Sequence, residues 1–96
     1  MMEIAAELDE KIINIVSQGV SGRFKKTKIT PETHLQKELG LDSIGILAMV
    51  FRFEELFSID IAQLGVDINV AKLKTVSDVI QAARDILNKA LLAKQA

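Results

Sequence analysis

Apolar residues recur along most of this chain at the three- and four-residue spacing of α-helices. The first set lies within residues 3–18 and stops before two glycines, which predicts a helix over that range. The last set follows Thr75, which has capping-box spacing to Asp78, with aspartate in place of the usual glutamate, and predicts a helix from about residue 76 to 92. The two sets are Ile4, Leu8, Ile12, Ile15 and Val16, and Val76, Val79, Ile80, Ala83, Leu87 and Ala90.

A third helical segment begins at Asp42 or Ser43, either of which is a good N-cap, and extends to about Leu56. Its apolar residues exceed what one buried face requires and form two stripes on a helical projection. The expected core stripe is Ile46, Met49, Val50, Phe53 and Phe57. The second stripe lies beside Ser43 and consists of Ile44, Leu47 and Phe51, flanked by Glu54 and Glu55. The second stripe either packs beneath a loop or a neighbouring helix, or forms an exposed docking strip with an acidic border.

The connections between these segments complete the predicted architecture. Residues 19–41 form a long loop, in which Thr30-Pro-Glu32 predicts a short helical turn near 31–37. Leu35 and Leu39 should anchor this loop to the core, and Gly40 breaks the chain before the middle helix. Residues 58–69 are irregular, a short helix is expected at 70–73, and strand signals are weak. We therefore predict one all-α domain over residues 1–96: three main helices plus a short helix in a bundle, with a long first loop.

Composition removes several classes of function. The chain has 96 residues, no cysteine and one histidine, His34, so thiolate or His-rich metal sites are excluded and a Ser-His-Asp triad is not expected. The net charge is −1, and the basic residues of segment 21–37 fit a solvated loop better than a nucleic-acid surface. No apolar stretch approaches the ~20 residues of a membrane span. The acidic start is not a signal peptide, so we expect a cytoplasmic protein without membrane insertion.

One segment carries candidate chemistry. Residues 39–44, Leu-Gly-Leu-Asp-Ser-Ile, place a serine hydroxyl at a helix start just after a glycine break. Such a position is reachable, and the unpaired N–H groups and positive dipole end of the helix tolerate an added phosphate. From Asp42 and Ser43 alone, a simple helix cap would be the better explanation of the pattern.

The segment strongly resembles the phosphopantetheine attachment motif of acyl carrier proteins, which has a Leu-Gly pair, one variable residue, and then Asp-Ser-Leu or a close variant. The resemblance continues at residues 53–61 and 74–79 and covers about residues 35–88. It implies that Ser43 bears a 4'-phosphopantetheine arm transferred from coenzyme A. It also implies that Asp42 orients the hydroxyl or holds a metal-bound cofactor in the modifying enzyme.

The resemblance implies a carrier that is not itself an enzyme. Its partners would be a phosphopantetheinyl transferase (holo-carrier synthase) and acyltransferases, ketosynthases or other acyl-chain enzymes, docking on Ile44, Leu47, Phe51, Glu54 and Glu55. The carrier would be a monomer. The family shelters hydrophobic cargo in its fold. In this chain the flexible side chain of Met49 and the small residues Ala82, Ala83 and Ala90 on the opposing helix suit that role. The alternative is that these alanines simply allow close helix packing.

The chain departs from the carriers of bulk fatty-acid synthesis, which are usually strongly acidic. It is near neutral, Gly45 stands where an acid often follows the motif, and Arg52 interrupts the middle helix. These differences leave open whether it serves fatty-acid synthesis or specialised lipid or polyketide synthesis. An unmodified helical module that binds a partner through Ile44, Leu47 and Phe51 is the alternative function.

Overall fold

A computed structural model describes the backbone of residues 2–20, 22–24 and 26–95, and the side chains of residues 7–20, 22–24 and 26–92. The side chain of Ile4, expected on the buried arc of the first helix, lies outside the described residues. The three helices are α1 (Met2–Gln18), α2 (Ser43–Phe57) and α3 (Val76–Gln95). Short 3-10 turns occur at η1 (Gly22–Phe24), η2 (Ala62–Leu64) and η3 (Val70–Lys72). The described residues contain one isolated β-bridge and no strand, which confirms the predicted all-α class.

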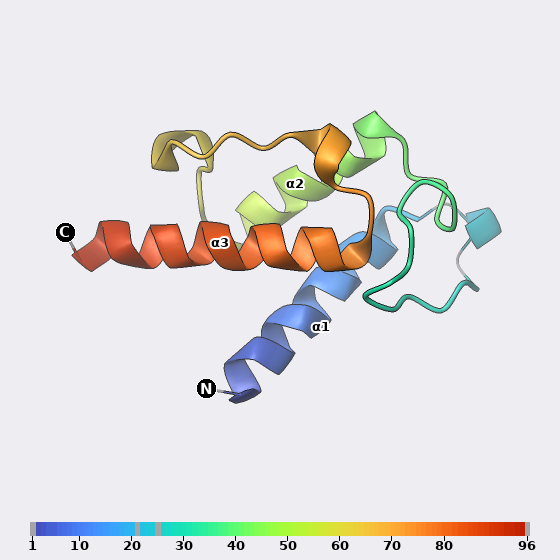
Figure 1. Ribbon diagram of the computed structural model, residues 1–96, viewed down its shortest axis with the longest axis horizontal. Helices are drawn as coiled ribbons and strands as arrows, with labels where there is room; N and C mark the ends of the chain where they lie inside the picture. The colour runs from blue at the N-terminus through green and yellow to red at the C-terminus, as the bar shows by residue number, and fades with distance from the viewer. Residues whose placement is uncertain (1, 21, 25, 96) are drawn as a thin grey trace.

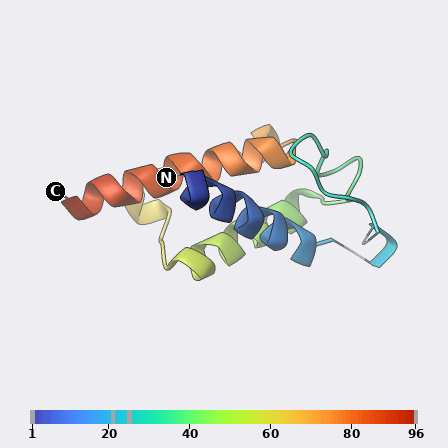
Figure 2. The same ribbon diagram turned by 90° about the horizontal axis from the view of Figure 1, so that it is seen from below.

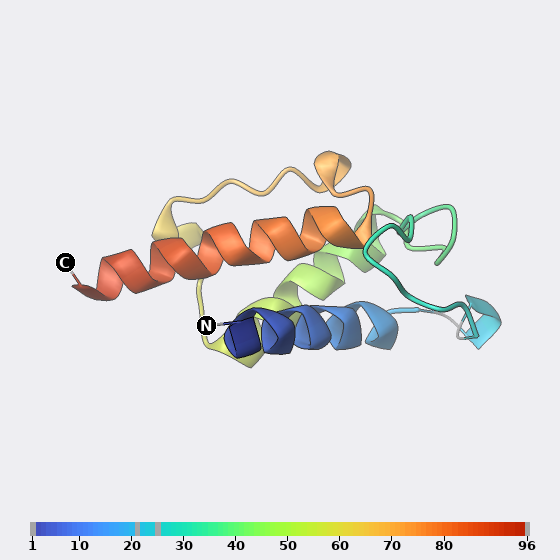
Figure 3. The ribbon, with the colours of Figure 1, turned by 60° about the horizontal axis from the view of Figure 1, so that its bottom comes forward.

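The three helices pack as a small bundle. α1 contacts both α3 and α2, while η3 packs on α2 and η2 on α3. Figure 1 shows the starts of α2 and α3 at the same end of the molecule as the long first loop. Figures 2 and 3 show both chain termini toward the other end. The segment singled out by its chemistry therefore lies far from both termini of a molecule 45 × 28 × 20 Å in extent.

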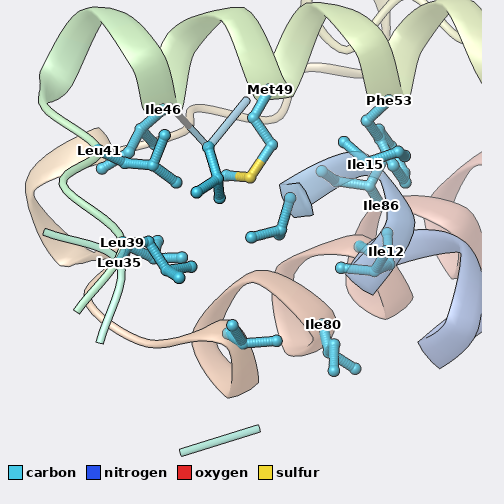
Figure 4. Packing of buried hydrophobic residues seen from close by; sticks show 14 of the residues in the cluster. Ile12, Ile15, Leu35, Leu39, Leu41, Ile46, Met49, Phe53, Ile80 and Ile86 are labelled. Atoms are coloured by element: carbon cyan, nitrogen blue, oxygen red, sulfur yellow. The ribbon is translucent and has the colours of Figure 1, made fainter. Parts of the chain in front are cut away.

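The core is built from aliphatic side chains of all three helices and of the first loop. Ile46, Met49 and Phe53 project from α2 into this core (Figure 4) and are buried, as predicted. Val50 and Phe57, from the same predicted stripe, are partly buried against the core cluster. Leu35 and Leu39, at 0% and 1% exposure, confirm that the loop is anchored in the core. Ile86 on α3, which the apolar pattern did not single out, is also buried.

The stretch near residues 31–37, where a short helical turn was expected, forms hydrogen-bonded turns and no continuous helix. One turn is closed by the bond from Thr33 N–H to Thr30 O (3.0 Å). The next turns are closed by the bonds from Glu38 N–H to His34 O (3.0 Å) and from Gly40 N–H to Gln36 O (3.0 Å). Between them the backbone pairs with the residues before α3: Leu35 N–H donates to Lys74 O (2.8 Å), and Val76 N–H donates to Thr33 O (3.0 Å). This pairing requires locally extended backbone, which interrupts the helical conformation.

The start of α3 confirms the predicted capping box. Asp78 N–H donates to Thr75 Oγ1 (3.2 Å), and Asp78 Oδ2 accepts from the N–H groups of Thr75 and Lys74, each at 3.0 Å. These two backbone donors lower the pKa of Asp78 from its ordinary value, because they stabilise the ionised carboxylate. α3 continues to Gln95, three residues beyond the predicted end. Within the described part of the chain, no helix combines the length and the apolar character needed to cross a bilayer.

Candidate functional site

Two neighbouring residues at the start of α2, Asp42 and Ser43, have different structural roles. Asp42 is the N-cap, with extended backbone, and its Oδ1 accepts a hydrogen bond from Gly45 N–H at 2.8 Å. Its carbonyl oxygen accepts the first helical bond, from Ile46 N–H at 2.9 Å. Ser43 is the first helical residue and is exposed. The cap therefore does not use the Ser43 hydroxyl, which is left at the surface for chemistry.

Buried anchors on either side of a glycine place this helix start. Leu39 and Leu41 are 1% and 4% exposed, and Gly40 between them has φ +68°, in the left-handed region that favours glycine. A Cβ on Gly40 would also lie 2.6 Å from Phe24 Cε2. Leu41 N–H donates to Leu35 O at 3.0 Å, which ties the turn to the loop. These contacts hold the backbone rigidly just before Asp42 and direct Ser43 outward.

The second apolar stripe of α2 is exposed. Ile44 is 78% exposed, Leu47 44% and Phe51 59%, so of the two alternatives the one in which they pack beneath a loop or neighbouring helix is wrong. Leu56, which was not assigned to this stripe, is also 52% exposed. We refer to Ile44, Leu47 and Phe51 as the α2 strip. It begins beside Ser43, so a partner that covers it would also reach the serine.

The two acids that border the α2 strip differ in their surroundings. Glu55 is exposed. Glu54 is only partly exposed, and its Oε2 accepts from Ile61 N–H at 2.9 Å, which fastens the connection after α2 to the helix. Glu54 therefore has a structural contact that the sequence did not reveal.

Comparison with known proteins agrees with this geometry. Residues 10–83 match the family described as "Phosphopantetheine attachment site". An acyl carrier protein from Syntrophobacter fumaroxidans (strain DSM 10017 / MPOB) is 31% identical over 78 residues, which cover 81% of this chain and 88% of that protein. The chain belongs to the acyl carrier protein family. No solved structure gave a significant match.

As an acyl carrier protein, the chain is a carrier rather than an enzyme, and it bears a covalently attached 4'-phosphopantetheine. The residues at the start of α2 fit such a group. Ser43 offers an exposed hydroxyl, and the first turn of a helix offers N–H groups and a positive dipole end to a phosphate. Gly45 leaves room for the cap, because a Cβ there would lie 3.2 Å from Leu41 Cδ2 and 3.4 Å from Asp42 Oδ1.

The acyl carrier protein also has a void in its core. Its volume is about 30 Å³, and Met49, Ala82 and Ala83 are among the residues that line it. Ala90, expected to contribute room, is not among them. A void of this size corresponds to about one water molecule. A long acyl chain therefore requires the core to widen.

The structure also brings basic residues to Ser43 that the sequence analysis missed. His34, Lys37 and Lys74 line a groove together with Asp42 and Ser43. Lys74 is about forty positions from His34 and Lys37 in the sequence, and the pairing of residues 33–35 with 74–76 brings the three together. A pairing of so few residues produces no periodic pattern of apolar residues, so it could not be predicted from the sequence.

Proposed function

We propose that Ser43 is the attachment point of the phosphopantetheine arm and that the chain carries acyl intermediates between the enzymes of a synthase. The arm's terminal thiol would hold each acyl group as a thioester. One observation carries the proposal: Ser43 is exposed at the start of α2, inside the segment that matches the family, while Asp42 supplies the cap. Modification of the serine would then leave the helix start intact.

Different residues of the chain would take part in modification and in docking. Buried Leu39 and Leu41 hold the backbone, and Asp42 keeps the helix start in place while a phosphopantetheinyl transferase acts on Ser43. The α2 strip, with Glu55 and part of Glu54 at its edge, would contact the transferase and then acyltransferases and ketosynthases. Exposed apolar side chains beside the attachment point support this assignment.

The pathway we propose is fatty-acid synthesis or a specialised lipid or polyketide synthesis. The net charge of −1 and the presence of Arg52 within α2 support a specialised set of partner enzymes. The carriers of bulk fatty-acid synthesis are usually strongly acidic, and this chain is not. We also propose that the protein acts in the cytoplasm, which the lack of cysteine fits.

Intact mass of the protein isolated from its own cells tests this proposal. We expect the mass of the chain plus one phosphopantetheine, with further mass from the acyl group, which would identify the cargo and hence the pathway. Peptide mapping should place the added group on Ser43. A chain found only in its unmodified form would favour the alternative, a helical module that binds partners through the exposed α2 strip.

A further inference from the structure

We infer that the groove beside Ser43 is a resting site for the proximal part of the arm, with its phosphodiester held by His34, Lys37 and Lys74; this rests on the proposed attachment at Ser43. The groove has a volume of about 450 Å³. That is within the range of ~300–1,000 Å³ typical of small-molecule sites. Because Ser43 itself lines the groove, a group bonded to its hydroxyl starts at the groove's edge.

Backbone hydrogen bonds fix the walls of the groove relative to one another. One wall is the loop segment 34–37, and it is tied to the segment before α3 by the bond from Leu35 N–H to Lys74 O (2.8 Å). The segment that contains Lys74, residues 70–74, is the second wall, and an internal bond from Leu73 N–H to Val70 O (3.1 Å) closes its turn. The start of α2 forms the third wall, and the bond from Leu41 N–H to Leu35 O (3.0 Å) ties the backbone before it to the first wall. A groove with walls fixed in this way costs little conformational entropy when a ligand occupies it.

The charges that line the groove suit an anion. Lys37 and Lys74 are exposed cations. Asp42 is the one acidic residue among those that line the groove, and its Oδ1 accepts a hydrogen bond from Gly45 N–H. His34 Nδ1 accepts from Lys37 N–H at 3.2 Å, so the neutral imidazole carries its hydrogen on Nε2 and can donate from there. A phosphodiester carries one negative charge, which matches this surplus of donors and positive charge.

The apolar part of the lining suits the next portion of the arm. Ile46 is buried, and Val70 and Leu73 are partly buried against the core cluster. Together they offer an apolar surface to the gem-dimethyl group of the pantoyl unit, which follows the phosphate directly. The lining thus offers both kinds of contact that this part of the arm can use, charged side chains for the phosphate and apolar side chains for the pantoyl unit.

The resting position would leave the partner face open. Ile44, Leu47 and Phe51 are not among the residues that line the groove, and Ile46, which does line it, lies on the opposite face of α2. A partner enzyme can therefore dock on the α2 strip while the arm is at rest. The arm then leaves the groove to deliver its cargo.

Nuclear magnetic resonance on the apo and holo forms tests this inference once intact mass has shown that one arm is attached. In the holo form we expect amide shift changes in segments 34–37 and 70–74, and nuclear Overhauser contacts from the gem-dimethyl protons to the Val70 and Leu73 side chains. The double variant Lys37→Gln/Lys74→Gln should lose these contacts and return the shifts toward their apo values. Lys89→Gln, an equivalent change of an exposed lysine on α3, should preserve them.

Two results would overturn the inference. One is an attached arm whose shift changes stay within residues 42–45 and whose gem-dimethyl group shows no contact with Val70 or Leu73. The other is a loss of contacts in Lys89→Gln as large as in the double variant. Failure of the arm to attach at all would overturn the proposed function, and this inference with it.

Discussion

At the scale of single residues, the residue that caps α2 is distinct from the neighbour that we propose as the attachment point. Asp42 accepts Gly45 N–H and so caps α2, while Ser43 is exposed in the first turn. The motif alone left open which of the two was the cap, because serine and aspartate are both preferred there. Only the backbone geometry at Asp42, extended where Ser43 is helical, decides it.

This separation predicts different costs for two substitutions. Ser43→Ala should remove the attachment point and change the free energy of unfolding by less than about 0.5 kcal/mol, as is usual for an exposed position. Asp42→Ala should lower it by about 1 kcal/mol, because Gly45 N–H loses its acceptor. Urea unfolding of both variants measures the difference. A larger loss for Ser43→Ala than for Asp42→Ala would show that the cap has been misassigned.

Asp78 predicts how stability changes in acid. Its folded-state pKa is lowered by the N–H groups of Thr75 and Lys74. A lowered folded-state pKa means that the ionised cap contributes its full stability above the unfolded-state pKa of ~3.9. This contribution is lost as pH falls through the folded-state value. Asp78→Asn should therefore unfold more easily at neutral pH and show a smaller acid-induced loss of stability than the wild type.

Thermal unfolding from about pH 7 to about pH 2 measures this effect. Asp67→Asn, which changes an exposed carboxylate in the connection before η3, is the matched control and should follow the wild-type profile. If Asp78→Asn lost as much stability in acid as the wild type, the Asp78 carboxylate would not be the titrating cap.

At the scale of elements, α2 is apolar on two faces, and burial distinguishes them. Phe53 is 6% exposed and its ring centroid lies 4.8 Å from that of Phe57, whereas Phe51, two residues away, is 59% exposed. The helical projection separated the two stripes correctly, because a period of 3.6 residues determines which side chains share a face. It could not say whether the second stripe is covered, since that depends on where the long connections run.

The two phenylalanines give a matched pair of substitutions. Phe53→Ala should cost roughly 3–5 kcal/mol of unfolding free energy, because it leaves a cavity in the core. Phe51→Ala should leave the melting temperature within a few degrees of the wild type, since the ring is mostly exposed, yet slow turnover by an enzyme that uses the carrier. Comparable destabilisation by both would contradict the assignment of the α2 strip as a free surface.

The elements also show how far sequence reasoning reaches. The three helices, the Leu35 and Leu39 anchors, and the Thr75–Asp78 capping box were all predicted, because periodicity and capping are local properties. A turn near residues 31–37 was also predicted, but its pairing with the residues before α3 and the groove beside Ser43 were not. Both involve the pairing of residues 33–35 with 74–76, which are about forty positions apart and make too few contacts to leave a periodic pattern.

At the scale of the whole molecule, the start of α2, where we propose the attachment point, lies at the opposite end of the long axis from the end of α3 (Figure 1). The core between them is well filled, with a void of about 30 Å³ near Met49. A bound acyl chain therefore has to separate helices that are already packed. Burial gains ~0.8 kcal/mol per methylene, and opening the core opposes that gain.

This balance predicts a dependence on chain length. Short acyl groups should leave the melting temperature and the core methyl shifts as they are in the unloaded holo form, because they bury too few methylene groups to offset the opening of the core. Longer chains should shift the resonances of Met49, Ala82 and Ala83, which line the void, and raise the melting temperature modestly. Thermal melting and methyl spectra of a series of acyl forms measure both. Unchanged spectra at every length would place the cargo outside the core.

The central claim, that Ser43 carries the arm, has a direct test. Wild type and Ser43→Ala are incubated with coenzyme A, magnesium and a broad-specificity phosphopantetheinyl transferase, and their intact masses are compared. We predict that the wild type gains one phosphopantetheine and that Ser43→Ala, still folded by circular dichroism, gains none. An unmodified wild type, or a modified alanine variant, would contradict the account.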